Sequence, residues 1–221
     1  MTTGVQLKVW GDYALFSRPE FKTERASYDM MTPSAARGIL EAVHWKPAIR
    51  WVVDRIRVLK PIRFDTIRRN EVANKASYAN ARQAAVGGKA MPYIIADEDR
   101  QQRAALVLRE VAYVIDAHFE MTGRAGPDDT TAKHAEMARR RIAKGQCVYQ
   151  PSLGTREFTA FFGPPGPGDD VVPSGLAGER DLGWMLHDID FADGMTPHFF
   201  HAVLRDGVLD VPPFVGGRGA A

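Results

Sequence analysis

Residues 32–69 contain the pattern that most restricts how this chain can fold, because a helix is followed directly by an arginine-rich strand. Thr32 is a suitable N-cap, and Pro33 takes the first helical position, where its missing N–H costs nothing. Pro47 disfavours helical backbone at the residue before it, so the helix ends near His44. Residues 51–59 are then predicted to form a strand, which residues 63–69 either continue or pair with.

Positive charge is concentrated in the same block. Residues 44–69 carry eight Lys or Arg and two acids, whereas the chain from residue 163 onward carries nine acids and three bases. The formal net charge of +2 is too small to predict nucleic-acid binding by itself. Its uneven distribution favours an anionic partner for the first three quarters of the chain.

Periodicity and turn residues predict the remaining elements. A second helix should begin at Asp129 or Thr130 and end at Gly145, a typical residue after a helix C-terminus. Residues 72–100 have no clear period and contain Gly87-Gly88, which predicts a long insertion. Further strands are predicted at residues 5–10, 111–121, 146–150, 155–162, 182–191 and 203–211.

The order strand, helix, strand, strand, helix, strand predicts an α+β chain. Residues 1–162 are expected to form a ferredoxin-like (RRM-like, βαββαβ) domain that carries the 72–100 insertion. Residues 163–221 are expected to form a small C-terminal antiparallel β region with a disordered tail. Asp206-Gly207 predicts a hairpin turn in this region.

The composition excludes several classes of protein. Cys147 is the only cysteine, so the chain can form neither an intrachain disulfide nor a cysteine-rich zinc site. No signal peptide is apparent, and no apolar run approaches the ~18 residues of a membrane span. We therefore expect a cytoplasmic protein with no membrane partner.

His44 and the Lys133-His134 pair are the candidate catalytic residues. A helix C-terminus favours a protonated imidazole, so we expect a raised pKa for His44. Lys133 and His134 open the second helix, where unpaired N–H groups attract an anion. The plainer alternatives are a surface histidine that completes a helix end and a solvated first helical turn.

A metal site near the C-terminus has less support. The motif His187-Asp-Ile-Asp and the pair His198 and His201 contain metal-ligand residue types. On a strand, however, His187 and Asp188 point to opposite faces, and an acidic segment is a poor place for a nucleic-acid phosphate. Neither a phosphate-binding GxxxxGK[ST] loop nor a GxSxG serine motif occurs. We predict no metal and no cofactor.

Several long segments together resemble the fifth CRISPR-associated protein in its subtype I-C form, a member of the RAMP superfamily. The resemblance covers nearly the whole chain apart from residues 72–100 and the extreme termini. The segments are GDYALFSRPEFKTERASYD, TPSAARGILEAVHWKPAIRW, LKPIRFDTIRRNEV, LGTREF and DLGWMLHDIDF.

The resemblance implies a metal-independent endoribonuclease that cuts precursor CRISPR RNA in the repeat hairpin. The ribose 2′-hydroxyl would attack, which leaves a 2′,3′-cyclic phosphate and a 5′-hydroxyl. The family's catalytic group is a Lys-His pair, matched by Lys133 and His134, and a tyrosine, whose position is taken here by His44. We predict His44 as base, Lys133 as the charge-stabilising group, and His134 as acid or phosphate-positioning group, although the histidine roles are exchangeable. Predicted RNA-binding residues are Tyr13, Lys22, Arg25, Lys46, Arg68 and Arg69.

The resemblance also implies partners. The protein would stay on the 5′ handle of the mature CRISPR RNA, next to the backbone and large subunits of the subtype I-C interference complex, with duplex DNA as a further candidate. Two alternatives remain. One is a non-catalytic subunit that caps the guide RNA, and the other is a stand-alone RNA- or DNA-binding protein.

Overall fold

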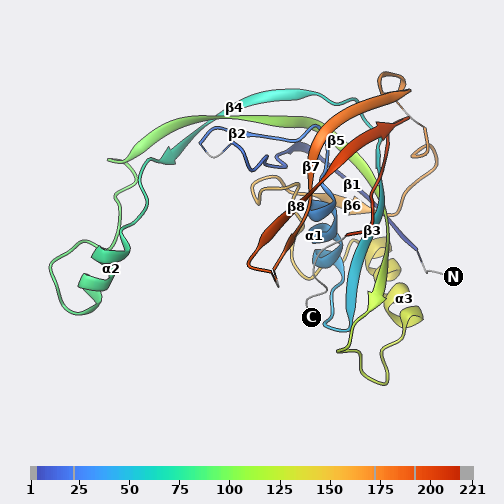
Figure 1. Ribbon diagram of the computed structural model, residues 1–221, viewed down its shortest axis with the longest axis horizontal. Helices are drawn as coiled ribbons and strands as arrows, with labels where there is room; N and C mark the ends of the chain where they lie inside the picture. The colour runs from blue at the N-terminus through green and yellow to red at the C-terminus, as the bar shows by residue number, and fades with distance from the viewer. Residues whose placement is uncertain (1–3, 22, 172, 192, 215–221) are drawn as a thin grey trace.

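One long strand, β5 (Arg100–Met121), organises the fold (Figure 1). The computed structural model describes residues 4–21, 23–171, 173–191 and 193–214. The inner half of β5 pairs with β1 (Val5–Ala14) on one side and β3 (Ile49–Val58) on the other, both antiparallel. Because it has neighbours on both sides, β5 is the central strand of the sheet.

The other strands extend this sheet in both directions. Within the described residues the order is β6-β1-β5-β3-β9-β8-β7, and β2 and β4 pair with the outer half of β5. Every pairing is antiparallel except that of β2 with β5. The bounds of these strands are β2 (Arg25–Ala26), β4 (Phe64–Val72), β6 (Phe161–Gly163), β7 (Glu179–Asp190), β8 (Thr196–Arg205) and β9 (Val208–Asp210).

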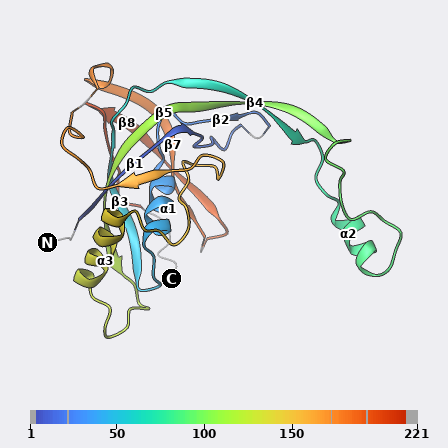
Figure 2. The same ribbon diagram turned by 180° about the vertical axis from the view of Figure 1, so that it is seen from behind.

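Two helices, α1 (Pro33–Val43) and α3 (Thr131–Lys144), cover one face of the sheet (Figures 1 and 2). The predicted caps are confirmed. The hydroxyl of Thr32 accepts a hydrogen bond from Ala35 N at 3.3 Å, and that of Thr130 accepts one from Lys133 N at 3.2 Å. Gly145 ends α3 with φ +62°, a left-handed conformation that glycine adopts without strain.

The core fills the space between the helices and the sheet. Alternate side chains of β1 and β5, such as Leu7, Val9 and Ile115, are fully buried against apolar residues of both helices, such as Ile39 and Ala138. The intervening side chains of these strands point away from the helices. The sheet therefore has one covered face and one open face.

An arm leaves the body of the molecule. It consists of β4 and the outer half of β5, and α2 (Tyr78–Ala85) lies at its far end (Figures 1 and 2). No residue of α2 is buried. The predicted 72–100 insertion is the end of this arm, and β4 pairs with β5, so the expectation that residues 63–69 continue or pair with the preceding strand is wrong.

Two predicted strands are also wrong. Residues 146–150 form no strand, because the chain turns at Gly145 and then passes the end of α1, where Val148 N donates to Ala42 O at 2.7 Å. Residues 155–162 fold back on the preceding segment through a bridge between Ser152 and Thr159, so that only β6 joins the sheet. Turn formation here replaces an extended ladder.

The C-terminal strands are continuous with the main sheet, because β9 pairs with β3. The predicted hairpin turn is confirmed: Arg205 pairs with Val208, and Asp206 and Gly207 have φ values of +46° and +71°. A separate folding unit from residue 163 onward stays a prediction. The predicted disordered tail lies outside the described residues. None of the described helices has the length and apolar character needed to cross a bilayer.

Gly154 gives a test of the chain reversal before β6. Its φ is +88°, and a Cβ added there would lie 2.0 Å from Leu15 O. Gly154→Ala should therefore lower the free energy of unfolding by about 2 kcal/mol or more in urea titrations. Gly38→Ala is the matched control, since a Cβ there meets nothing within 4 Å and alanine favours the helix by up to about 1 kcal/mol. Equal stability of the two variants would contradict this turn.

Candidate active site

Two imidazoles from distant parts of the sequence meet between the helices. His44 is the C-cap residue of α1, and His134 lies in the first turn of α3. Nε2 of His44 lies 3.1 Å from Nδ1 of His134, within hydrogen-bond distance. The predicted catalytic histidines are thus neighbours, although 90 positions separate them in the chain.

The covered face of the sheet holds this histidine pair in place. Trp51 of β3 donates a hydrogen bond from its indole N–H to His44 O at 2.7 Å. The ring of Phe119 on β5 meets both Trp51, at a centroid distance of 5.1 Å, and His134, at 6.2 Å, edge to face. Strand pairing of Trp51 with Phe119 therefore positions the end of α1 and the start of α3 together.

Asp129 completes the cluster. Its Oδ1 lies 3.1 Å from Nε2 of His134. A hydrogen bond that Gly126 N donates to the carboxylate is the main cause that lowers the pKa of Asp129, and His134 contributes in the same direction. The carboxylate is therefore ionised at neutral pH and accepts a proton from His134 Nε2. This arrangement orients the ring of His134.

The hydrogen-bond pattern leaves one ring nitrogen open. With His134 neutral and Nε2 protonated, its Nδ1 accepts the Nε2 proton of His44. Nδ1 of His44 then carries a lone pair, and it has no hydrogen-bond partner among the described residues. The chain of groups Asp129, His134 and His44 therefore ends in a proton acceptor.

Burial decides the charge of His44. The residue has no exposed surface, and His134 is 1% exposed. Burial, followed by the positive charges of Arg141, His134 and Lys46, lowers the pKa of His44 to about 4. The expected increase at a helix C-terminus is therefore wrong, because removing the imidazolium from water outweighs the helix dipole.

Lysines flank the pair on the solvent side. Lys133 is exposed, and its Nζ donates to Asp128 O at 3.1 Å. Lys46 is also exposed, next to the end of α1, and has no ion-pair partner in the described part of the chain. Arg141 donates to Val43 O at 2.8 Å. These cations give the surface above the buried pair a positive charge.

The other predicted RNA-binding residues lie elsewhere, where the arm joins the body. Arg25 pairs with Glu71 at 3.4 Å, and Arg69 pairs with Glu157 at 2.9 Å. Arg68 is exposed on β4, and Tyr13 packs against Phe158 at a centroid distance of 6.0 Å. Lys22 lies outside the described residues.

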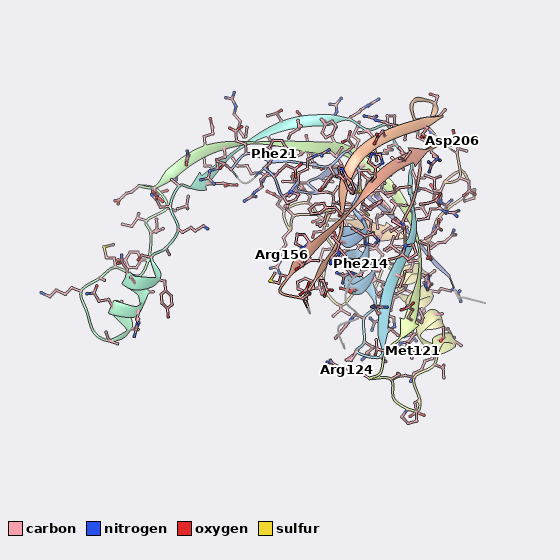
Figure 3. All side chains as sticks on the ribbon, in the orientation of Figure 1. Phe21, Met121, Arg124, Arg156, Asp206 and Phe214 are labelled. Carbon is pink, nitrogen blue, oxygen red and sulfur yellow. The ribbon has the colours of Figure 1, made fainter. Side chains whose placement is uncertain are left out.

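These residues and the histidine pair occupy separate regions of the molecule. Phe21, close in sequence to Arg25, is near the arm in Figure 3, whereas Met121 and Arg124, which precede α3, are at the opposite end of the body. The structure thus separates the predicted RNA-binding residues into two groups, of which only Lys46 accompanies the pair.

No group of three or more His, Cys, Asp or Glu side chains that could hold a metal ion occurs within the described ranges. Near the C-terminus, Asp188 accepts two hydrogen bonds from Arg37, each 2.8 Å long. His187 Nε2 contacts Pro212 O at 2.7 Å. Both side chains are therefore used in packing the C-terminal strands onto the body.

Asp129 and Arg141 are the site residues that sequence reasoning missed. Asp129 was considered only as a helix cap, and Arg141 only as part of a basic run. The position of Asp129 five residues before His134, in the loop that enters a helix, is a signal that could have indicated the contact. Nothing in the sequence indicates that Arg141 reaches the end of α1.

Comparison with known proteins places this geometry in a family. The model of the family described as "CRISPR-associated protein (Cas_Cas5)" matches residues 4–212. The chain belongs to this family. A protein of Mannheimia succiniciproducens named "CRISPR pre-crRNA endoribonuclease Cas5d" is 56% identical over 219 residues, which cover 97% of each chain. A protein of the same name from Thermus thermophilus is 43% identical over 227 residues, 94% of this chain and 91% of that one.

Solved structures share the fold. The crystal structure of a CRISPR-associated protein superposes with a TM-score of 0.69 at 23% identity, covering 95% of this chain and 92% of the other. A chain of a "CRISPR RNA-guided surveillance complex" superposes with a TM-score of 0.51 at 13% identity, covering 98% and 95%. The curled antiparallel sheet with few helices is therefore an arrangement that this chain shares with both structures.

The low pKa of His44 predicts how stability depends on pH. The unfolded chain takes up a proton at this residue near pH 6.5, whereas the folded chain does so only near pH 4, so the contribution of His44 to stability is lost as the pH falls through this window. Urea unfolding of His44→Phe should show a weaker loss of stability between pH 6.5 and 4 than the unchanged protein. His201→Gln, an exposed histidine on β8, should keep the full dependence. Equal slopes in all three proteins would contradict the burial of a neutral His44.

Proposed function

We propose that this chain is an endoribonuclease that cleaves precursor CRISPR RNA in the repeat hairpin without a metal ion. The observation that supports the proposal is the 3.1 Å contact between His44 and His134, backed by Asp129. The names of the two relatives support the substrate class. Acid-base chemistry by paired imidazoles suits attack of the ribose 2′-hydroxyl on the adjacent phosphate.

The two histidines act as one base. The 2′-hydroxyl proton moves to Nδ1 of His44, and the Nε2 proton of His44 moves to Nδ1 of His134. The positive charge then rests on His134, where the carboxylate of Asp129 stabilises it, rather than on His44, whose own pKa of about 4 makes it a weak base at neutral pH. Both nitrogens of His134 are engaged, so we assign it as the holder of the proton instead of the acid.

The alkoxide then attacks the phosphorus in line, and the 5′-oxygen leaves. The products are a 2′,3′-cyclic phosphate and a 5′-hydroxyl. Lys133, which is exposed beside the pair, stabilises the extra negative charge on the phosphorane. Lys46 lies on the same side and contacts a neighbouring phosphate of the RNA.

Access to His44 requires a movement, because neither ring is exposed. We assign this movement to residues 146–150, which contain no helix or strand and contact the last turn of α1 through the hydrogen bond from Val148 N to Ala42 O. RNA binding would displace this segment and expose Nδ1 of His44. The buried resting state would keep water and unrelated RNA away from the base.

The same burial favours a second candidate function. A histidine pair that never reaches solvent is a structural contact between α1 and α3, and the chain would then cap the 5′ end of the guide RNA without cutting it. In either case we place the protein in the cytoplasm with the mature guide, next to the backbone and large subunits of the subtype I-C interference complex. The surveillance-complex chain of the same fold supports this placement.

We also infer a ferredoxin-like arrangement for the first part of the chain. The strands β1, β3, β5 and β6 follow one another with α1 and α3 in the order βαββαβ, and their spatial order is β6-β1-β5-β3. Sequential numbering of these four strands gives the order 4-1-3-2. This order supports a split βαβ unit in which the arm is an extension of the central hairpin.

Cleavage of repeat RNA by the purified chain tests the enzyme assignment. His44→Ala, His134→Ala and Lys133→Ala should each lower the single-turnover rate by about 10²–10⁴-fold, because each removes one group of the reaction, while RNA affinity changes little. His201→Ala should cut at the unchanged rate. A 2′-deoxy substitution at the cut site should abolish cleavage, and EDTA should have no effect. Loss of cleavage in EDTA would contradict the mechanism, and RNA binding without any cleavage would favour the capping function.

Asp129→Asn tests the shared proton. Asparagine keeps the size of the side chain but removes the charge that stabilises a protonated His134, so the plateau rate should fall by at least about 10-fold. Because the pair becomes harder to protonate, the acid limb of the pH–rate profile should move to lower pH. Asp128→Asn is the matched control, since the side chain next to it in sequence has no printed contact with the pair and only its backbone is used. An unchanged pH profile in Asp129→Asn would show that the carboxylate is structural.

A further inference from the structure

The open face of the sheet carries a pocket that the cleavage site does not use. Its volume is about 480 Å³, which is within the usual range for small-molecule sites. The strands contribute Lys8 and Trp10 of β1 and Ala112 of β5, and the wall is the segment from Gly163 to Asp169. Leu59 and Lys60, directly after β3, and Pro164 and Gly166 complete the lining.

This pocket and the histidine pair lie on opposite faces of the sheet. Ala112 pairs with Trp10, and Tyr113 pairs with Val9, whose side chain is fully buried on the helix side. Phe119, which contacts His134, has the same parity as Tyr113 along β5 and so points to the helix side as well. A ligand in the pocket therefore cannot be the group that is cut.

Two aromatic rings form a flat platform at the pocket. Trp10 and Phe161 occupy paired positions on β1 and β6, and they are 38% and 52% exposed. Their ring centroids are 6.2 Å apart at an interplanar angle of 25°. Exposed, nearly parallel rings on a sheet are surfaces on which unpaired bases stack.

Positive charge lies next to the platform. Lys8 Nζ is 5.9 Å from the centroid of the Trp10 ring and 2.7 Å from Asp169 Oδ1. Lys60 is exposed and forms no ion pair with any described residue. The pocket lining therefore has two ammonium groups and one carboxylate, so that one positive charge remains for a phosphate.

Asp169 also fixes the wall of the pocket. Its Oδ2 accepts a hydrogen bond from Gly166 N at 2.6 Å, and its own N–H donates to Gly166 O at 3.2 Å. Together with the ion pair to Lys8, these bonds anchor the turn that follows β6 onto the sheet. The pocket is thus formed before any ligand binds, and Lys8 is held beside the indole.

We propose that this pocket binds one unpaired nucleotide of the RNA, with its base stacked on Trp10 and its phosphate at Lys60. The substrate class rests on the proposed function, but the requirement for a flat ring and an anion comes from the pocket itself. An acidic peptide would satisfy the lysine and leave the indole uncovered. Because the pocket is behind the cut site, it contributes to RNA affinity and not to the chemical step.

The first test is RNA affinity in the full chain. Trp10→Ala should raise the Kd for the repeat RNA about 5- to 150-fold, which is the loss expected for one stacked base. Trp10→Phe should keep most of the affinity, and Trp10→Leu, which is apolar but cannot stack, should not. Trp184→Ala is the control, since this side chain is 66% exposed on β7 and far along the sheet from the pocket. The cleavage rate at saturating RNA should be unchanged in all four variants.

The second test concerns the phosphate. Lys60→Ala should reduce the slope of log Kd against log salt by about 0.7–0.9, whereas Trp10→Leu should leave the slope unchanged. Wild-type affinity in both Trp10→Ala and Trp10→Leu would overturn the pocket, whatever the chain does to RNA. Affinity that depends on Trp10 in a chain that binds but never cuts would overturn the nuclease proposal and keep the pocket. Equal loss of affinity for a single-stranded DNA of the same sequence would show that the site reads the base and phosphate without the 2′-hydroxyl.

Discussion

The alternation of side chains along β5 is the constraint on which the rest of this structure depends. Its inner half pairs with β1 and β3 over a long register, so one set of residues faces the helices and the other set faces outward. The first set includes Phe119, which supports the histidine pair, and the second includes Ala112, which forms part of the pocket. A slip of one residue would exchange the two sets and destroy both sites.

The chemistry of the histidine pair follows from its burial. Desolvation holds His44 neutral, and the carboxylate of Asp129 offers a place for positive charge one ring further in. A tyrosine, which the resemblance leads one to expect at residue 44, has a single polar atom. An imidazole has two nitrogens, so His44 can accept a proton on one side and release another to His134. The substitution therefore changes how the proton is handled.

Local sequence signals predicted those elements whose ends depend on a few neighbouring atoms. Thr32 and Thr130 cap helices through their own hydroxyls, and Asp206-Gly207 forms a tight turn, so these features did not need the rest of the molecule. The outer half of β5 was missed because Glu110, with φ +52°, interrupts the alternation that identified the inner half. The strands expected at 146–150 and 155–162 failed because β-rich composition there serves turns, which pack against α1 and against Leu15.

The sequence by itself determined the helices that carry His44 and His134, the basic character of residues 44–69, and the family resemblance, because caps, charges and motifs are properties of short segments. Only the tertiary structure decided that the two imidazoles touch, that Asp129 supports them, and that the pKa of His44 is lowered instead of raised. It also decided that Trp10, unremarked in the sequence, stands beside Lys8 at an open pocket. Distances between remote segments and the exclusion of water arise only when the sheet and helices pack, and these two quantities control the protonation of a buried group.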